Sequence, residues 1–222
     1  MGKAKDAAGE PTGTKLALIE AAGELFADRG LEGTSTRGIA EKAGSNIGCI
    51  HYHFGGKEGL YWSAIEYVFH CRITDQSVGL ALPDGPTPQG ISNFLAELVR
   101  RRLLAACGPN VPAWHSRLLW RNIADGLRGT RPELVDRVFR PDFERFWGIA
   151  REARPRITDR QARLIFYQLI GQLIFYSHCQ AKVLRELGGE TYGPELLAEI
   201  IDHIALSLTR VLGLPDPTHG GD

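Results

Sequence analysis

The stretch from Gly30 to Leu60 reads GLEGTSTRGIAEKAGSNIGCIHYHFGGKEGL and has the clearest structural pattern in this chain. It predicts two very short helices with a turn at Gly44, then a break at Gly55-Gly56 before a longer helix begins at Lys57. Short helices bury little surface and persist only when neighbouring elements pack against them. We therefore expect the stretch to present a surface, because a helix, turn and helix form the unit whose second helix can enter a DNA major groove.

Outward from this stretch, apolar residues recur with helical spacing, and no strand alternation of useful length interrupts them. The predicted helices cover about 14–30, 36–43, 45–54, 57–78, 87–107, 112–126, 131–153, 158–187 and 194–213. Residues 1–13 are small, charged and contain Gly and Pro, so we expect a disordered tail. The sequence thus predicts an all-α chain of about nine helices, with a three-helix domain at 14–60 and a larger helical domain at 61–222.

The composition is that of an ordinary globular protein, with 43% hydrophobic and 23% charged residues. Lys and Arg number 26, as do Asp and Glu, so the net charge is zero. Residues 1–60 carry seven basic and eight acidic side chains. This sequence lacks the basic footprint that is first expected of a DNA-binding protein, and the DNA hypothesis must rest on geometry and residue placement.

The four cysteines contain no CxxC pair, and no signal-peptide apolar core follows the N-terminal lysines. Both features predict free thiols in a reducing cytoplasm. The longest apolar run, 164–176, is interrupted by Gln168, Gly171 and Gln172 and is too short to span a bilayer. We therefore expect a buried core helix there and no membrane partner.

The residues of the helix–turn–helix stretch have the chemistry that DNA contact requires. Ser35 and Thr36 stand at a helix N-terminus, where hydroxyl and backbone N–H groups can hold a phosphate. The next helix begins with small polar residues that allow close approach to base edges, and Ile47, Ile50 and Phe54 are expected on its inner face. Its remaining side chains, and the lysine after it, can reach phosphates: His51, Tyr52, His53 and Lys57.

The spacing of the candidate residues argues against phosphate-loop, metal-binding and catalytic motifs. Gly55-Gly56-Lys57 lacks the first Gly and the final Ser/Thr of a P-loop. His51 and His53 are two apart on a helix and do not share a face, which argues against a metal pair. No nucleophile elbow of the G-x-S-x-G type is present in the sequence. We expect no metal, no cofactor and no enzymatic activity.

The segments TSTRGIAEKAG and SNIGCIHYHFGGKEGLY together resemble the N-terminal domain of the tetracycline-repressor (TetR) family of bacterial transcription regulators. The correspondence is ungapped from Gly30 to Leu60, and the form NIxxIxYHFGxKExLY further resembles the subgroup with a CecR-type C-terminal domain. The positions characteristic of the family are Ile39-Ala40, Ala43-Gly44, Gly48, Phe54 and Lys57-Glu58. Beyond this stretch, helix number and lengths agree with the family in outline only.

The resemblance implies that the third helix is the recognition helix and that the fourth leads into a ligand-binding domain. It also implies a base or phosphate contact from Arg37. The implied DNA-contacting residues are Thr34, Ser35, Thr36, Arg37, Ser45, Asn46, Gly48, Cys49, His51, Tyr52, His53 and Lys57. This sequence departs from the family where His51 and His53 replace a common tyrosine, Gly55 a frequent proline and Gly56 a common serine.

Aromatic and basic side chains of the C-terminal half are the candidates for lining an effector pocket. They are Trp114, His115, Arg117, Trp120, Arg121, Trp147, Tyr167, Tyr176 and His178. We interpret Arg100, Arg101 and Arg102 instead as the solvated face of a helix.

The last two predicted helices carry wide apolar stripes, which the resemblance implies form a four-helix interface between two copies. The stripe of the last helix consists of Leu196, Leu197, Ile200, Ile201, Ile204, Leu208 and Val211. Such a stripe is equally consistent with core inside one chain.

Sequence and resemblance together predict a ligand-responsive transcriptional regulator, a repressor that binds a near-palindromic DNA operator as a homodimer and is released by an unknown small molecule. Its half-sites would lie about one helical turn apart, roughly 34–36 Å. Two alternatives stay open: a small-molecule-binding helical protein whose helix–turn–helix is degenerate, and an enzyme in the helical domain.

Overall fold

The computed structural model describes residues 13–71, 80–82, 85–107, 111–124 and 132–218, and over these ranges the chain forms ten helices and no strand. The helices are α1 (Gly13–Arg29), α2 (Thr36–Lys42), α3 (Ile47–Phe54), α4 (Lys57–Phe69), α6 (Pro88–Cys107), α7 (Ala113–Ala124), α8 (Pro132–Ala153), α9 (Asp159–His178), α10 (Gln180–Leu187) and α11 (Pro194–Leu212). The all-α prediction is confirmed. The predicted tail, up to residue 12, and residues 72–78 of the predicted fourth helix lie outside the described residues.

The ends of α2 and α3 lie within two residues of the predicted bounds. The Ser35 hydroxyl accepts a hydrogen bond from the Gly38 N–H at 3.1 Å and caps α2. The side-chain oxygen of Asn46 accepts one from the Cys49 N–H at 3.0 Å and caps α3. After α3 the chain turns through Gly55 at φ 73°, a left-handed conformation that glycine adopts without strain.

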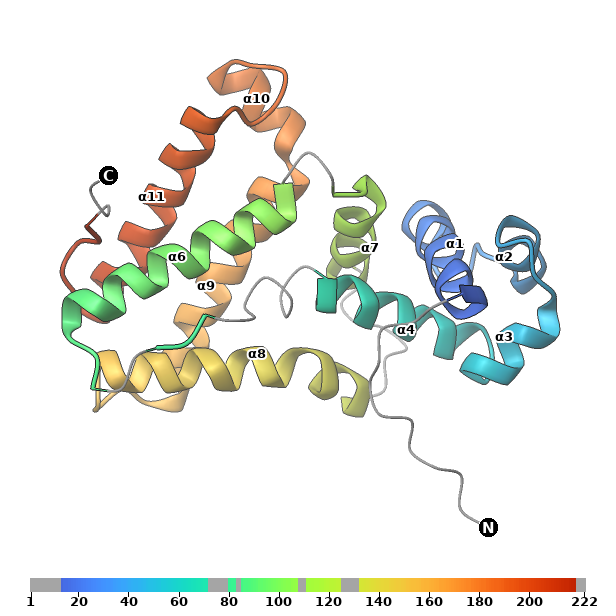
Figure 1. Ribbon diagram of the computed structural model, residues 1–222, viewed down its shortest axis with the longest axis horizontal. Helices are drawn as coiled ribbons and strands as arrows, with labels where there is room; N and C mark the ends of the chain where they lie inside the picture. The colour runs from blue at the N-terminus through green and yellow to red at the C-terminus, as the bar shows by residue number, and fades with distance from the viewer. Residues whose placement is uncertain (1–12, 72–79, 83–84, 108–110, 125–131, 219–222) are drawn as a thin grey trace, which may run out of the picture.

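The N-terminal core is formed by α1 to α4 together with a helix from much later in the chain. Trp114 and Leu118 of α7 belong to the same buried cluster as Phe26, Ile39 and Ile50. Figure 1 shows α7 beside α1 and over α4, between the N-terminal helices and the rest of the molecule. The core that supports the helix–turn–helix therefore extends past Leu60 and includes part of the C-terminal half.

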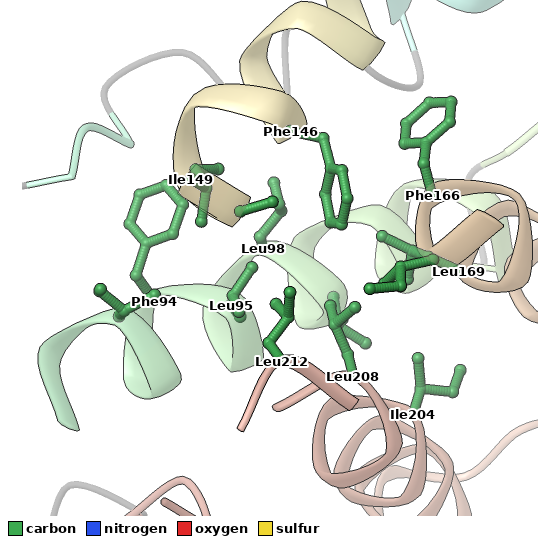
Figure 2. Packing of buried hydrophobic residues seen from close by; sticks show 14 of the residues in the cluster. Phe94, Leu95, Leu98, Phe146, Ile149, Phe166, Leu169, Ile204, Leu208 and Leu212 are labelled. Atoms are coloured by element: carbon green, nitrogen blue, oxygen red, sulfur yellow. The ribbon is translucent and has the colours of Figure 1, made fainter. Parts of the chain in front are cut away.

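The C-terminal core lies between α6, α8, α9 and α11. Figure 2 shows the apolar side chains of the four helices pointing toward one another: Phe94, Leu95, Leu98, Phe146, Ile149, Phe166, Leu169, Ile204, Leu208 and Leu212. The apolar stripe of α11 is thus largely used within the chain, whereas Val211, expected in that stripe, is 39% exposed. Of the helices described, none is long and apolar enough to cross a membrane.

The predicted helix 158–187 is wrong as a single helix, because it breaks at Cys179 into α9 and α10. A continuous helix would use the Tyr176 carbonyl to accept a hydrogen bond from the N–H of residue 180. In the structure this carbonyl accepts one from the Tyr192 hydroxyl at 2.9 Å instead. The start of the helix is as expected, since Thr158 and Gln161 form a reciprocal capping box.

The interpretation of Arg102 as a solvated residue is also wrong. Arg100 is exposed and Arg101 is half-buried, and both pair with Glu97. The side chain of Arg102 is 4% exposed and forms an ion pair with the buried Asp142 of α8. Three arginines in succession cannot share one helix face, so one of them points into the core. The partner that neutralises it is 40 residues away.

Candidate nucleic-acid interface

The recognition-helix candidate α3 stands at the outer end of the N-terminal helices, away from the C-terminal core (Figure 1). Ile50 is fully buried and anchors the helix, while His51, Tyr52 and His53 are exposed. Tyr52 is 83% exposed, and its ring meets that of His53 edge to face with centroids 4.9 Å apart. An aromatic ring this open contributes little to the core, so its hydroxyl is available to a phosphate.

The first turn of α3 offers fewer polar groups than the sequence suggested. The side-chain oxygen of Asn46 is committed to the cap, although the residue is exposed. Ser45 and Cys49 are half-buried, and Gly48 is exposed without a side chain. The expectation that Ile47 faces inward is wrong, because it is 40% exposed at the start of the helix.

A shallow, open hollow lies between the start of α2 and the start of α4. Its lining residues are Glu32, Gly33, Thr34, Ser35, Thr36 and Lys57. Ser35 is exposed, and its hydroxyl can still donate a hydrogen bond outward while it accepts one from Gly38. The hollow therefore brings together the serine, threonine and lysine of the sequence-predicted phosphate contacts, at positions 35, 36 and 57.

Thr34 has a structural role that removes its side chain from the predicted DNA contacts. It is 2% exposed. Its hydroxyl donates a hydrogen bond that is shared between two carbonyl oxygens, that of Gly30 at 2.7 Å and that of Leu25 at 3.2 Å. These bonds satisfy backbone acceptors at the C-terminal end of α1. The threonine holds the loop before α2 against α1, and the residues beside it are the ones that face solvent.

The basic residues of the interface are mostly paired. Arg37 is exposed but forms a 2.9 Å ion pair with Glu41 on the next turn of α2. Lys42 lies 2.7 Å from Glu24 of α1. Glu32 shares the hollow with Lys57. The absence of a basic footprint in the sequence thus persists in the structure, because the cations of this face have acidic neighbours.

Three effector-pocket candidates lie at α1 instead of in the C-terminal core. Trp114 packs against Gly23, Arg117 pairs with Asp28 at 3.1 Å, and Arg121 donates to the Asp28 carbonyl at 3.3 Å. Next to them His115 is buried, with its ring 4.2 Å from that of Trp114. These residues connect α7 to the helix–turn–helix.

The other candidates are distributed along α7, α8 and α9. Trp120 of α7 stacks on His178 of α9 with centroids 4.7 Å apart, and burial lowers the pKa of His178 below its usual value. Trp147 and Tyr176 are partly buried at the edge of the C-terminal core, whereas Tyr167 is 59% exposed. Among these candidates, the structure brings the rings of Trp120 and His178 into contact.

At or near the candidate residues, the sequence did not predict the exposure of Ile47, the acidic Glu32 in the hollow or the buried pair Arg102–Asp142. The position of Glu32 could have been inferred from the local sequence, since it precedes the phosphate-binding candidate Ser35 by three residues. In the part of the chain that the structure describes, no three His, Cys, Asp or Glu side chains group as metal ligands.

Comparison with known proteins matches both parts of the chain. Residues 18–63 match the model of bacterial regulatory proteins of the tetR family, and residues 91–211 match that of the C-terminal domain of the HTH-type transcriptional dual regulator CecR. The HTH-type transcriptional repressor Rv3405c of Mycobacterium tuberculosis is 37% identical over 148 residues, covering 53% of this chain and 79% of the relative. The transcriptional repressor AcnR of Corynebacterium glutamicum is 41% identical over 56 residues, 25% of this chain, and the match spans 30% of AcnR.

Solved structures share the arrangement of helices along most of the chain. The fatty acid degradation regulator FadR from Bacillus halodurans has a TM-score of 0.61 at 16% identity, covering 90% of this chain and 97% of its own. A transcriptional regulator from Rhodococcus sp. RHA1 has a TM-score of 0.60 at 18% identity, with the same two coverages. At these identities the likeness concerns the fold alone.

Proposed function

The chain belongs to the tetR family of bacterial regulatory proteins, and we propose that it is a transcriptional repressor that binds a near-palindromic operator as a homodimer and leaves it when a small molecule binds. The observation that carries the proposal is the exposure of the α3 face at the outer end of the molecule, above a core that includes α7. The proposed activity is binding, not catalysis, and it takes place where the chromosome is, in the cytoplasm.

The proposed DNA contacts follow from how each side chain is exposed. Tyr52, His51 and His53 reach phosphates beside the groove that α3 enters, and Ser35, Thr36 and Lys57 hold a phosphate at the hollow. Arg37 becomes available to a base or phosphate when it exchanges Glu41 for DNA, an exchange that exposed i,i+4 pairs permit because they are worth less than about 1 kcal/mol. Because the cations described on this face lie beside acidic residues, we expect that two subunits must bind together for useful affinity.

We place the homodimer interface on α9, with α11 at its side. Leu164, Tyr167, Gly171 and Phe175 all lie on the solvent side of α9, and the three large ones are 61%, 59% and 46% exposed. Gln168, in the same face, donates a hydrogen bond to Ser207 of α11 at 2.9 Å and ties the two helices together. An apolar helix face left open in a monomer is a common site of association. Because most of the α11 stripe is core, we assign α9 the larger share of this interface.

The proposed effector acts through α7. Its binding in the C-terminal half, near the stack of Trp120 on His178, would favour a conformation in which α7 and the attached α1 move. DNA is released if that conformation sets the two α3 helices at the wrong separation, which requires that the effector bind the two conformations with different affinities.

The DNA proposal is tested by selecting duplexes from a random pool and measuring affinity by fluorescence anisotropy at several salt concentrations. We expect a near-palindrome, and tighter binding at lower salt. Tyr52→Ala should weaken binding to every sequence about equally, whereas Arg37→Ala should also relax sequence preference. Leu187→Ala, a similarly exposed large residue on α10, is the matched control and should change neither. Recovery of no selective, salt-sensitive duplex would instead favour an effector-binding protein with a degenerate helix–turn–helix.

The dimer proposal has its own test at two helical glycines. Neither Gly171 on α9 nor Gly148 on α8 has an atom within 4 Å of an added Cβ, so both accept a side chain in the monomer. Sedimentation should show that Gly171→Arg yields monomers with unchanged helicity, while Gly148→Arg remains dimeric. Equal behaviour of the two variants would place the interface elsewhere.

A further inference from the structure

Ile47 begins α3 with 40% of its surface open to solvent. Single exposed apolar residues are ordinary on protein surfaces and need no function by themselves. The position of this one is unusual, because the N-terminal residues of a recognition helix are those that contact base edges. A large aliphatic side chain therefore lies where a residue that contacts bases is expected.

The side chains next to Ile47 are less available than Ile47 itself for contact with base edges. The Asn46 side-chain oxygen, which a bidentate contact with adenine would need, accepts the capping hydrogen bond from Cys49 N–H. Ser45 and Cys49 are half-buried. Among the side chains described in this first turn, Ile47 is the one that is both large and exposed.

Gly48 favours this contact because it has no side chain. A Cβ atom there would lie 3.0 Å from the capping oxygen of Asn46, so a side chain would crowd the cap. Without one, the backbone of the first turn can come close to the base pairs and carry Ile47 with it. The glycine thus preserves the Asn46 cap and allows Ile47 to come close to the base pairs.

The chemistry of the major groove determines what an aliphatic side chain can read there. Guanine, adenine and cytosine present hydrogen-bond donors and acceptors, whereas thymine adds a C5-methyl group. An isoleucine gains by contact with that methyl and loses by covering unpaired polar groups of other bases. We propose that Ile47 reads the C5-methyl group of a thymine at a fixed position in each operator half-site. The inference rests on the proposed function and specifies one base of the sequence that the protein recognises.

The test removes the methyl group alone, by replacing single thymines of the selected operator with deoxyuridine. With the wild-type protein, one position per half-site should weaken binding about fourfold, the effect of one buried methyl-sized group. Deoxyuridine in the flanks is the control on the DNA side and should have no effect. The Ile47→Ala protein should bind the thymine and deoxyuridine operators equally.

A second variant distinguishes a change in base preference from a loss of folding. Ile47→Gln introduces a side chain that bonds adenine through two hydrogen bonds, so selection with this protein should replace the thymine by adenine at that position. Circular dichroism of both variants should match the wild type, since Ile50 and not Ile47 anchors the helix.

Two outcomes separate this inference from the proposed function. An operator that binds selectively but shows no deoxyuridine effect at any half-site thymine, or an effect that persists in Ile47→Ala, overturns the inference and leaves the repressor proposal in place. Absence of any selective duplex binding overturns both.

Discussion

A Cβ atom added to Gly23 of α1 would overlap the indole ring of Trp114, so this ring of α7 occupies the space that a larger residue would need. The pair joins positions 91 residues apart and brings the C-terminal half of the chain into the core of the DNA-binding unit. The ion pair of Arg117 with Asp28 and the bond from Arg121 to the Asp28 carbonyl lie along the same contact. A movement of α7 must therefore be transmitted to α1.

Gly23→Ala should destabilise the protein by about 1–3 kcal/mol, the usual cost of overpacking, even though alanine favours helix by about 1 kcal/mol over glycine. Urea unfolding followed by circular dichroism measures the change. The control is Gly148→Ala on α8, where nothing lies within 4 Å and the helix propensity should be gained without a clash. Equal effects at the two glycines would contradict the tight packing of Trp114. The double variant Gly23→Ala/Trp114→Leu should recover part of the loss, because the smaller side chain leaves room for the Cβ.

Asp142→Asn should destabilise the fold by about 3–5 kcal/mol, because it leaves the Arg102 charge buried without a counter-ion. One guanidinium nitrogen of Arg102, Nε, already has no hydrogen-bond partner. The double variant Arg102→Met/Asp142→Leu removes both charges and should be near the wild type in stability. Arg100→Gln, which disrupts an exposed pair with Glu97, should cost less than about 1 kcal/mol. If Asp142→Asn costs no more than Arg100→Gln, the pair is not buried in solution.

Glu32→Gln should strengthen operator binding, because a carboxylate in the hollow repels the phosphate that Ser35 and Lys57 are proposed to hold. We expect a gain of up to about fivefold per half-site at low salt, the size of one exposed charge interaction. The gain should shrink as salt screens the repulsion. Anisotropy titrations at two salt concentrations measure it, with the exposed Glu190→Gln in the C-terminal half as the control. An unchanged affinity would show that no phosphate occupies this hollow.

The protein should lose thermal stability on mild acidification through His178. Burial lowers the pKa of His178 in the folded state below the usual 6.5, so the unfolded chain binds the proton more tightly. The stability that the neutral imidazole contributes is fully present above pH 6.5 and is lost as the pH falls toward the lowered folded pKa. Tm measured between pH 7.5 and 5.5 should therefore fall less steeply in His178→Gln than in the wild type. A slope in His178→Gln as steep as that of the wild type would contradict the role of His178.

Much of the fold and of the site could be predicted from local residues. Ser35 and Asn46 accept hydrogen bonds from residues three positions away, and Gly55 turns the chain by its own backbone freedom, so the sequence alone places both helices and the turn. The exposure of Tyr52 follows from the same periodicity that buries Ile50. Ile47 was misplaced because it lies at the border of the buried face, where periodicity alone does not decide exposure.

Capping, glycine conformation and helical period act within a few residues, so the all-α class, the helix–turn–helix and its family could be predicted from the amino-acid sequence. Helix packing, in contrast, places α7 against α1, turns Arg102 inward to Asp142 and breaks a single predicted helix at Cys179. Each of these depends on a partner distant in the chain: Trp114 for Gly23, Asp142 for Arg102, and the Tyr192 hydroxyl for the carbonyl of Tyr176. Periodicity marks a residue as buried or exposed, but contact between distant residues is set by how the helices pack.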